Sequence, residues 1–192
     1  MVCRAWNVAL GASLALLAGA ALALAGPLTP AASGNACRSH GDTQPTRLSV
    51  LHARSAVRCL LNRKRQSHGL SRIRANDRLE RAAQRHTRYM TQHGCFSHQC
   101  RGERSVLARL MRVSYIVGGL TRWSFGENIA WGAGGSGQPK AIVRSWMRSP
   151  GHRANILNPR FDEIGIGFRT GYPRSPKADG GTYTTDFGMR KG

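Results

Sequence analysis

Two imidazoles and one carboxylate, those of His98, His152 and Glu127, are among the side chains of this sequence that could do chemistry. Two imidazoles near a carboxylate can hold a divalent transition metal such as zinc and leave positions open to water. A water on that metal, with Glu127 beside it, could hydrolyse a substrate. The alternative role for Glu127 is structural, because a carboxylate in a Gly-Glu-Asn segment can accept from backbone and histidine donors.

Other hydrolytic chemistries lack their residues. The sequence has no H-E-x-x-H helix and no nucleophile elbow, which argues against those metalloprotease and serine-hydrolase classes. A glycosidase needs two well-placed carboxylates, and the whole chain has 9 acidic residues. A thiol protease needs a free cysteine, whereas each cysteine after the N-terminal segment has a candidate disulfide partner.

Cysteine usage indicates an oxidising compartment. Cys3 lies in the expected export segment, and four cysteines follow: Cys37, Cys59, Cys95 and Cys100. An even count favours disulfides, but four cysteines allow three pairings and the sequence alone does not choose between them. We favour Cys95–Cys100, which closes a small loop, and therefore Cys37–Cys59. A zinc site is the alternative, although the spacings lack paired C-x-x-C motifs.

The N-terminus is typical of a signal peptide over residues 1–25. Arg4 supplies the positive charge, an apolar run without charges follows, and the letters ALA at 23–25 fit a cleavage site. The alternative is an uncleaved membrane anchor, because the run approaches the ~20 residues that span a bilayer. We expect cleavage, no transmembrane span afterwards, and a secreted, extracellular protein. Residues 26–47 predict a flexible leader, and residues 48–192 a single domain.

The chain is strongly basic, with 29 Lys and Arg against 9 Asp and Glu and a formal net charge of +20. Such a surface attracts polyanions, which outside a cell are anionic lipids, acidic glycans and wall polymers. The sequence shows no basic region followed by heptads, no zinc-finger spacing and no aromatic RNA-binding strand. We therefore expect an anionic cell-envelope surface as partner, and no specific nucleic acid.

Two longer helices are predicted to support these residues. Apolar residues recur at helical spacing over residues 49–66 and again over the segment from Asp77 to Gly94. Asn76 or Asp77 caps the second helix, and Gly94 ends it. His86 lies on the buried stripe of this helix, and we interpret it as a core histidine rather than a ligand.

Shorter elements complete the expected fold. Residues 105–111 predict a short helix with Val106, Leu107, Leu110 and Met111 inward, and two further helices begin at Pro139 and Pro150. The glycine-rich segment 132–137 indicates a flexible connection. Strands are expected over residues 125–130, 163–169 and 183–189, the last two as an antiparallel pair. Helices first and strands late predict an α+β fold with helices packed on an antiparallel sheet.

Several short motifs, in order, resemble the bacterial branch of the CAP superfamily (cysteine-rich secretory proteins, antigen 5, pathogenesis-related 1). They are LLN at 60–62 with GL at 69–70, FSH at 96–98, GENIA at 126–130, WMRSPGHRANIL at 146–157, IGIG at 164–167 and YTTDFG at 183–188. The resemblance spans about residues 48–189. It implies a three-layer α-β-α sandwich, with a small antiparallel sheet between helices and an open cleft lined by two histidines and acidic residues.

The cleft residues follow from the resemblance by position. His98 and His152 match the two histidines, the candidate ligands for zinc or another divalent metal, and Glu127 matches the first acidic residue. Many members carry a second glutamate shortly after the tryptophan that matches Trp146, and this chain has no carboxylate there. Ser149 would face the cleft if the helix continued through Pro150. Without the second acid, we expect metal binding to be weak.

Two functions remain in competition at this point. The first is a non-catalytic extracellular binding module for lipid, glycan or protein, which the varied binding activities of the resembled family favour. The alternative is a metal-dependent extracellular hydrolase that uses His98, Glu127 and His152. Turnover with and without a chelator separates the two.

Overall fold

The computed structural model describes residue 37 and residues 39–192, so the expected signal peptide lies outside the described residues. The elements, in chain order, are η1 (Pro45–Arg47), α2 (Val50–Gln66), β1 (Arg74–Ala75), α3 (Asp77–Gln92), α4 (Val106–Arg112), β2 (Arg122–Ala133), η2 (Gly134–Gly137), α5 (Pro139–Arg148), α6 (Pro150–Ile156), β3 (Glu163–Thr170) and β4 (Gly180–Lys191). No helix in this described part is long and apolar enough to cross a membrane.

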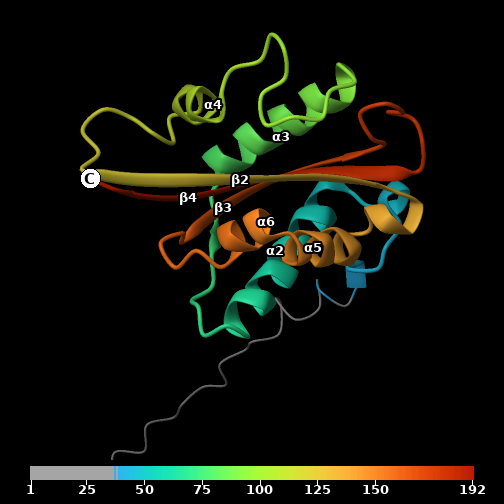
Figure 1. Ribbon diagram of the computed structural model, residues 1–192, viewed down its shortest axis with the longest axis horizontal. Coiled ribbons are helices and arrows are strands. Elements are labelled where there is room, and N and C mark those ends of the chain that lie inside the picture. The colour runs from blue at the N-terminus through green and yellow to red at the C-terminus, as the bar shows by residue number, and fades with distance from the viewer. Residues whose placement is uncertain (1–36, 38) are drawn as a thin grey trace, which may run out of the picture.

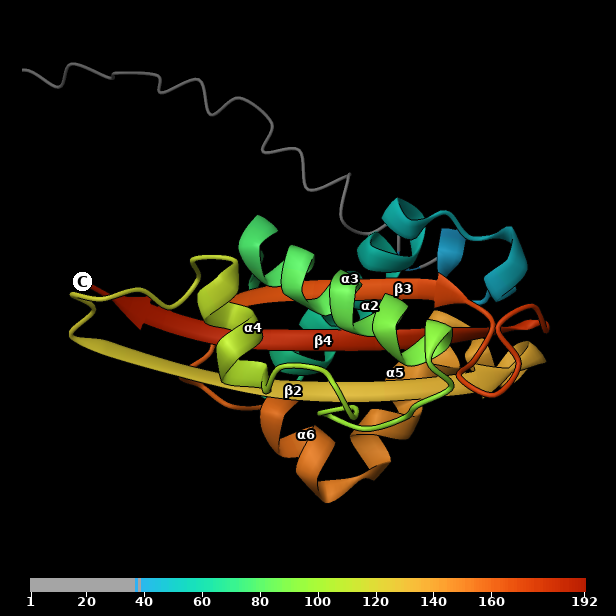
Figure 2. The same cartoon turned by 90° about the horizontal axis from the view of Figure 1, so that it is seen from above.

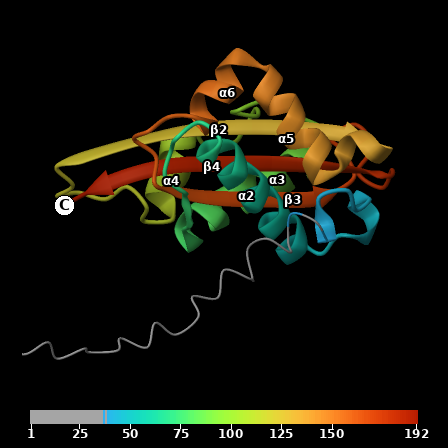
Figure 3. The ribbon, with the colours of Figure 1, turned by 90° about the horizontal axis from the view of Figure 1, so that it is seen from below.

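The elements form three layers around one sheet (Figure 1). The strand order is β1-β3-β4-β2, and both β2 and β3 run antiparallel to β4. Helices α3 and α4 cover one face, while α2, α5 and α6 lie on the other (Figures 2 and 3). This confirms the predicted α-β-α sandwich. The short strand β1 is an addition, because it pairs parallel to β3 at the edge opposite β2.

Helices α2 and α3 begin at side-chain caps. Ser49 accepts a hydrogen bond from the His52 backbone N–H at 3.1 Å, and Asn76 accepts from the two N–H groups of Arg78 and Leu79. Asn76, not Asp77, is therefore the cap of α3. Past the end of α3, Gly94 adopts a positive φ of 64°, as a helix stop requires.

Two glycines let α3 lie directly on strand β3. A Cβ at Gly165 would come 2.0 Å from the backbone carbon of Leu79, and one at Gly167 would come 2.4 Å from the carbonyl oxygen of Ala83. No larger residue fits without displacing the helix. The IGIG motif thus sets the height of α3 above the sheet, and with it the height of His86.

The larger hydrophobic core lies between the sheet and helices α2, α5 and α6, where Trp146 is 1% exposed. A smaller cluster lies under α3 and α4, and it includes Leu79, Leu110 and Tyr115. The expected helix over residues 105–111 exists, but Met111 was wrongly placed inward. Met111 is 55% exposed, and Arg109 is buried instead.

The folded part of the chain begins before residue 48, earlier than the expected end of the flexible leader. Cys37 is buried and bonded to Cys59, and the Lys140 backbone N–H donates to the Gly41 carbonyl at 2.9 Å. The second disulfide joins Cys95 to Cys100. Both favoured pairings are therefore confirmed.

Candidate functional site

The site is centred on Glu127, whose carboxylate is held from two sides. Glu127 lies on β2 and is 8% exposed. Its Oε1 accepts a hydrogen bond from His98 Nδ1 at 2.8 Å, and its Oε2 accepts from Arg109 Nη2 at 2.7 Å. Because His98 Nδ1 carries the donated proton, His98 Nε2 is the nitrogen left to accept or to ligate.

The Arg109 side chain forms hydrogen bonds with three segments of the chain. Besides Glu127, its Nη2 donates to the His98 carbonyl at 3.0 Å and its Nη1 to Glu103 Oε1 at 3.4 Å. Its side chain is 8% exposed. Arg109 lies three residues after Val106 on the inward side of α4. The sequence analysis missed this residue.

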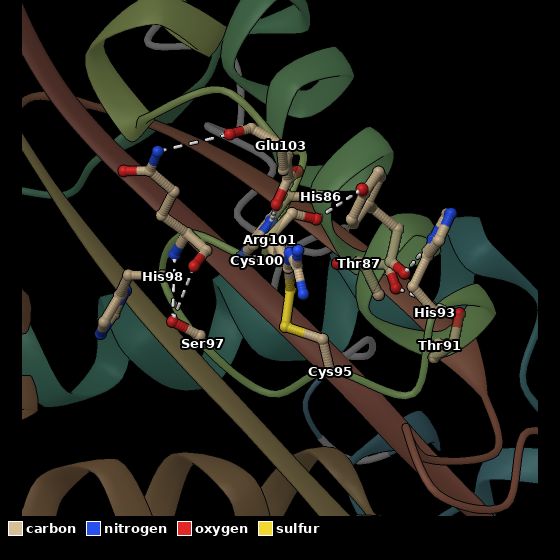
Figure 4. The surroundings of a disulfide bond; sticks show 12 residues. His86, Thr87, Thr91, His93, Cys95, Ser97, His98, Cys100, Arg101 and Glu103 are labelled. Atoms are coloured by element: carbon tan, nitrogen blue, oxygen red, sulfur yellow. Dashed lines mark hydrogen bonds and ion pairs between the residues drawn. A yellow bond between two sulfur atoms is a disulfide. The ribbon is translucent and has the colours of Figure 1, made fainter.

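His86 is a core histidine, as its position on the buried stripe of α3 predicted. It is 0% exposed, and its Nδ1 lies 2.8 Å from Glu103 Oε2 (Figure 4). Burial lowers the pKa of His86 to about 3, with further lowering from the positive charges of Arg109 and His98. Its Nε2 lies 3.9 Å from Glu127 Oε1 and has no hydrogen-bond partner. His86 is therefore neutral and closes the inner wall of the site.

Glu127 forms a carboxyl pair with Asp186. The two residues are opposite each other in the β2–β4 register, so their side chains lie on the same face of the sheet. Two buried carboxyl groups this close in the sheet disfavour each other's ionised form. Burial raises the pKa of Glu127 to about 7 and that of Asp186 well above its ordinary value. Asp186, at 2% exposure, is the deeper of the two.

The loop that carries His98 is fixed by its own contacts. The Cys95–Cys100 disulfide closes it, and the hydroxyl of Ser97 both donates to the Gln99 carbonyl and accepts from the Gln99 N–H (Figure 4). The His98 side chain is 53% exposed, so the imidazole reaches solvent while Nδ1 binds Glu127. Burial, and then the charge of Arg109, lower the pKa of His98.

His152 lies on the other face of the sheet from α3 and α4. It lies on α6 and is half-buried, and its carbonyl accepts from Asn128 Nδ2 at 3.1 Å. Its pKa is lowered by burial first and then by the electrostatic influence of His98. That the two imidazoles share one site stays a prediction.

Helices α5 and α6 are attached to β2 by side-chain donors. Trp146 Nε1 donates to the Ile129 carbonyl at 3.1 Å, and Asn155 Nδ2 donates to the Glu127 carbonyl at 3.2 Å. A Cβ at Gly126 would come 2.7 Å from Asn155 Oδ1, so this approach requires a glycine. These contacts give a physical reason for the spacing of the GENIA and WMRSPGHRANIL motifs.

The expectation that Ser149 faces the cleft required one helix to continue through Pro150. Helix α5 ends at Arg148, α6 begins at Pro150, and Ser149 between them is extended, with φ −91° and ψ 120°. The helix is therefore not continuous through Pro150, as the expectation required. Ser149 makes no side-chain capping hydrogen bond, and its place in the cleft stays a prediction without that support.

Among the described residues, the donor set does not reach the three protein ligands of a catalytic zinc site. A metal-binding histidine usually donates its second ring N–H to a carboxylate, as His98 does to Glu127. Catalytic zinc sites have three protein ligands. Within residues 37 and 39–192, no group of three or more His, Cys, Asp and Glu side chains is placed to hold a metal. The expectation that His98 and His152 share a metal ion stays a prediction.

Known proteins resemble this chain both in sequence and in structure. A family model described as the cysteine-rich secretory protein family, CAP, matches residues 59–183. An uncharacterized protein of Bacillus subtilis, YkwD, is 36% identical over 109 residues, which cover 57% of this chain and 39% of that protein.

Two solved structures are also similar. One is an extracellular protein of Bacillus anthracis with an SCP domain, at 27% identity and a TM-score of 0.57; the match covers 72% of this chain and 40% of that one. The other, an outer surface protein of Borrelia burgdorferi, supports the fold at 18% identity and a TM-score of 0.56, with 70% of this chain and 90% of that one covered. The chain thus spans about two fifths of the length of the two Bacillus relatives.

Proposed function

Because this chain belongs to the cysteine-rich secretory protein family, CAP, we propose that it is a non-catalytic extracellular binding domain. Its partner would be anionic cell-envelope material, either lipid or glycan, recognised through the basic surface. Zinc or another divalent metal would be held weakly by His98 and His152 and would support the structure of the cleft rather than turnover.

The observation that carries this proposal is the way the Glu127 carboxylate is hydrogen-bonded. A general base needs a lone pair directed at the proton it abstracts from the substrate. Both Glu127 oxygens already accept short hydrogen bonds, from His98 and Arg109, and Asp186 lies opposite Glu127 in the strand register. These hydrogen bonds suit a residue that holds the His98 loop, α4 and β2 together. This favours the structural role over the hydrolase alternative.

The distribution of charge supports an anionic partner. Four carboxylates are exposed, those of Asp42, Asp77, Asp162 and Asp179. Two of these form ion pairs, Asp42 with Lys140 and Asp162 with Arg74. The other five acidic residues are at least partly buried, which leaves most surface arginines without a negative neighbour. A surface of this kind binds polyanions more weakly as salt is added.

Export is part of the same proposal. The Bacillus anthracis relative is described as extracellular and the Borrelia burgdorferi one as an outer surface protein. The two disulfides are compatible with an oxidising compartment. We expect cleavage after Ala25, so that the secreted protein begins at Gly26. Mass spectrometry of secreted material tests this, and a mature chain that retains Trp6 contradicts it.

The binding proposal is tested with vesicles of anionic phospholipid, vesicles of neutral phospholipid and an anionic polysaccharide, over a range of salt concentrations. We expect binding to the anionic targets that weakens with salt. Equal binding to neutral and anionic vesicles without a salt effect contradicts the proposal. In parallel, peptide, ester and glycoside substrates are assayed with and without chelator. Chelator-sensitive hydrolysis that Glu127→Ala abolishes would instead establish the hydrolase.

A further inference from the structure

Helix α3 carries a row of arginines along its outer side. Figure 2, which looks onto the layer formed by α3 and α4, shows no described element in front of this helix. At about 100° per residue, its four exposed arginines fall within an arc of about 80°, on the side away from the buried residues. They are Arg78, Arg81, Arg85 and Arg88, and we call them the arginine stripe. Because an α-helix rises about 1.5 Å per residue, the stripe is about 15 Å long.

The arginine stripe is not neutralised within the described part of the chain. None of its side chains forms an ion pair with a described carboxylate. The helix itself supplies no partner, because Glu80 pairs with Arg54 at 3.0 Å and the exposed Asp77 forms no ion pair with a described residue. Like charges three or four residues apart on a helix repel each other, and the stripe contains three such pairs in succession. A bound chain of negative charges would relieve that repulsion.

Arginines on the neighbouring elements are used differently, because the fold itself binds them. On α2, Arg54 donates to the Ile166 carbonyl at 2.8 Å in addition to its ion pair with Glu80. The buried Arg65 of the same helix donates to the Ile156 carbonyl, also at 2.8 Å. No side chain of the arginine stripe forms a hydrogen bond with another described residue. The stripe is therefore available to a partner in a way that these structural arginines are not.

The remaining surface of α3 disfavours two classes of polyanion. Its aliphatic and thioether side chains are all buried, so the helix has no such side chain to insert among the acyl chains of a lipid; they are Leu79, Ala82, Ala83 and Met90. The stripe has no aromatic ring on which the bases of a single-stranded nucleic acid would stack. The one aromatic residue of the helix, Tyr89, is half-buried and already stacks on His93.

A linear acidic polysaccharide suits the arginine stripe better. A guanidinium donates two parallel hydrogen bonds to a carboxylate, and this geometry is specific to arginine. One such contact at an exposed position is weak. Several contacts on one chain add, because the first holds the next carboxylate close to its arginine. A polymer with a carboxylate on successive sugar rings can therefore bind along the stripe, whereas a small anion reaches a single arginine.

We propose that the arginine stripe is the docking surface for a linear acidic polysaccharide, whose successive carboxylates pair with Arg78, Arg81, Arg85 and Arg88. This inference rests on the proposed function, because it names the class of anionic partner and the face that binds it. The surface is distinct from the cleft: His86, on the same helix, points to the inner side and is 0% exposed.

The test measures binding of an oligouronate to the disulfide-bonded mature protein by calorimetry at several salt concentrations. The stripe variant is Arg81→Gln with Arg85→Gln. The matched control is Arg144→Gln with Arg148→Gln on α5, an exposed pair with the same four-residue spacing on the opposite face of the sheet (Figure 3). The stripe variant should be at least as stable to heat as wild type, because it removes a pair of like charges. Circular dichroism and thermal unfolding check that each variant is folded.

We expect the oligouronate to bind about tenfold or more weakly to the stripe variant, a loss of about 1.4 kcal/mol, and to stay within about twofold of wild type in the control. The slope of log affinity against log salt should become shallower by about 1.5 in the stripe variant, because two fewer counterions are released, and should change little in the control. A single uronic acid should bind wild type about tenfold or more weakly than the oligouronate.

Each of the following outcomes overturns the inference. Equal losses in the two variants mean that total charge, not the stripe, decides binding. An oligouronate that binds no more tightly than a single uronic acid removes the contacts with successive rings. Tighter binding of an oligodeoxynucleotide of matched charge, with the same dependence on Arg81 and Arg85, identifies a nucleic-acid surface instead.

Two results separate this inference from the proposed function. No oligouronate binding, with salt-sensitive binding to anionic vesicles intact, removes the glycan surface alone. Failure to bind any polyanion removes the proposed function as well.

Discussion

Replacing Arg109 by methionine should destabilise the protein strongly, and more so at high pH. Arg109 makes contacts of 2.7 Å with Glu127, 3.0 Å with the His98 carbonyl and 3.4 Å with Glu103. The Glu127 and Glu103 side chains are 3% and 9% exposed, so water cannot replace the lost cation. Removing one partner from a buried ion pair costs about 3–5 kcal/mol. We expect a loss of this size in free energy of unfolding at pH 8.

The pH dependence follows from the charges that Arg109 acts on. Its positive charge lowers the pKa of Glu127, Glu103 and Asp186, and it also lowers the pKa of His86 and His98. Without it, the pKa of all five rises, so the folded variant binds more protons than folded wild type. Stability then falls more steeply with rising pH. One extra proton over one pH unit is worth about 1.4 kcal/mol, so the cost at pH 5 should be smaller by at least about that amount.

Urea unfolding at pH 5 and pH 8 measures this effect. Arg112→Met is the matched control, because Arg112 is on the same helix, is exposed and has no ion pair with any described carboxylate. We expect the control to stay within about 0.5 kcal/mol of wild type. The reasoning fails if Arg109→Met is equally mild, or if its cost is larger at pH 5 than at pH 8.

Three further predictions concern the disulfides, a glycine and the metal. Replacing both cysteines of Cys37–Cys59 by alanine should lower the free energy of unfolding by about 3 kcal/mol, and the same change at Cys95–Cys100 by about 2 kcal/mol. The reason is that the longer loop loses more entropy when it is closed, and the sequence separations are 22 and 5. Urea unfolding that gives the reverse order contradicts this reasoning. Gly167→Ala should lower the free energy of unfolding by more than about 2 kcal/mol, because its methyl group meets α3. Gly135→Ala is the control, because a methyl group there has open space around it. Equal thermal stability of the two variants would count against the close packing of α3 on β3. Calorimetric titration with zinc at neutral pH should show weak binding to wild type, and His98→Ala and His152→Ala should each abolish it. The binding should also weaken as pH falls through the imidazole pKa. The same zinc affinity in wild type and both variants rejects a shared site.

Much of the scaffold was predictable because its signals are local. The Asn76 cap, the Gly94 stop and the alternating strand β3 are each specified by a few neighbouring residues. The disulfide pairing and the three-layer fold were likewise expected and are confirmed. The resemblance directed attention to His98 and Glu127, and the structure brings them into contact at 2.8 Å.

The residues that complete the site were missed because their partners are distant in the sequence. An arginine on a short helix usually faces solvent, and only Glu127, eighteen positions later, explains why Arg109 is buried. Asp186 lies on β4, which is covered on both faces, so alternation of polar and apolar residues carries no information there. The burial of a central strand thus hides a carboxyl group of the candidate site that a half-exposed strand would have revealed.

The attachment of α5 and α6 to β2 also bears on association between molecules. An edge strand with free carbonyl groups is a template on which another chain can form a further strand. At Glu127 and Ile129 these carbonyls are already occupied by Asn155 and Trp146. A second copy would have to displace a buried indole before it could extend the sheet. The middle of β2 is therefore protected against edge-to-edge aggregation by the same two side chains that attach α5 and α6 to the sheet.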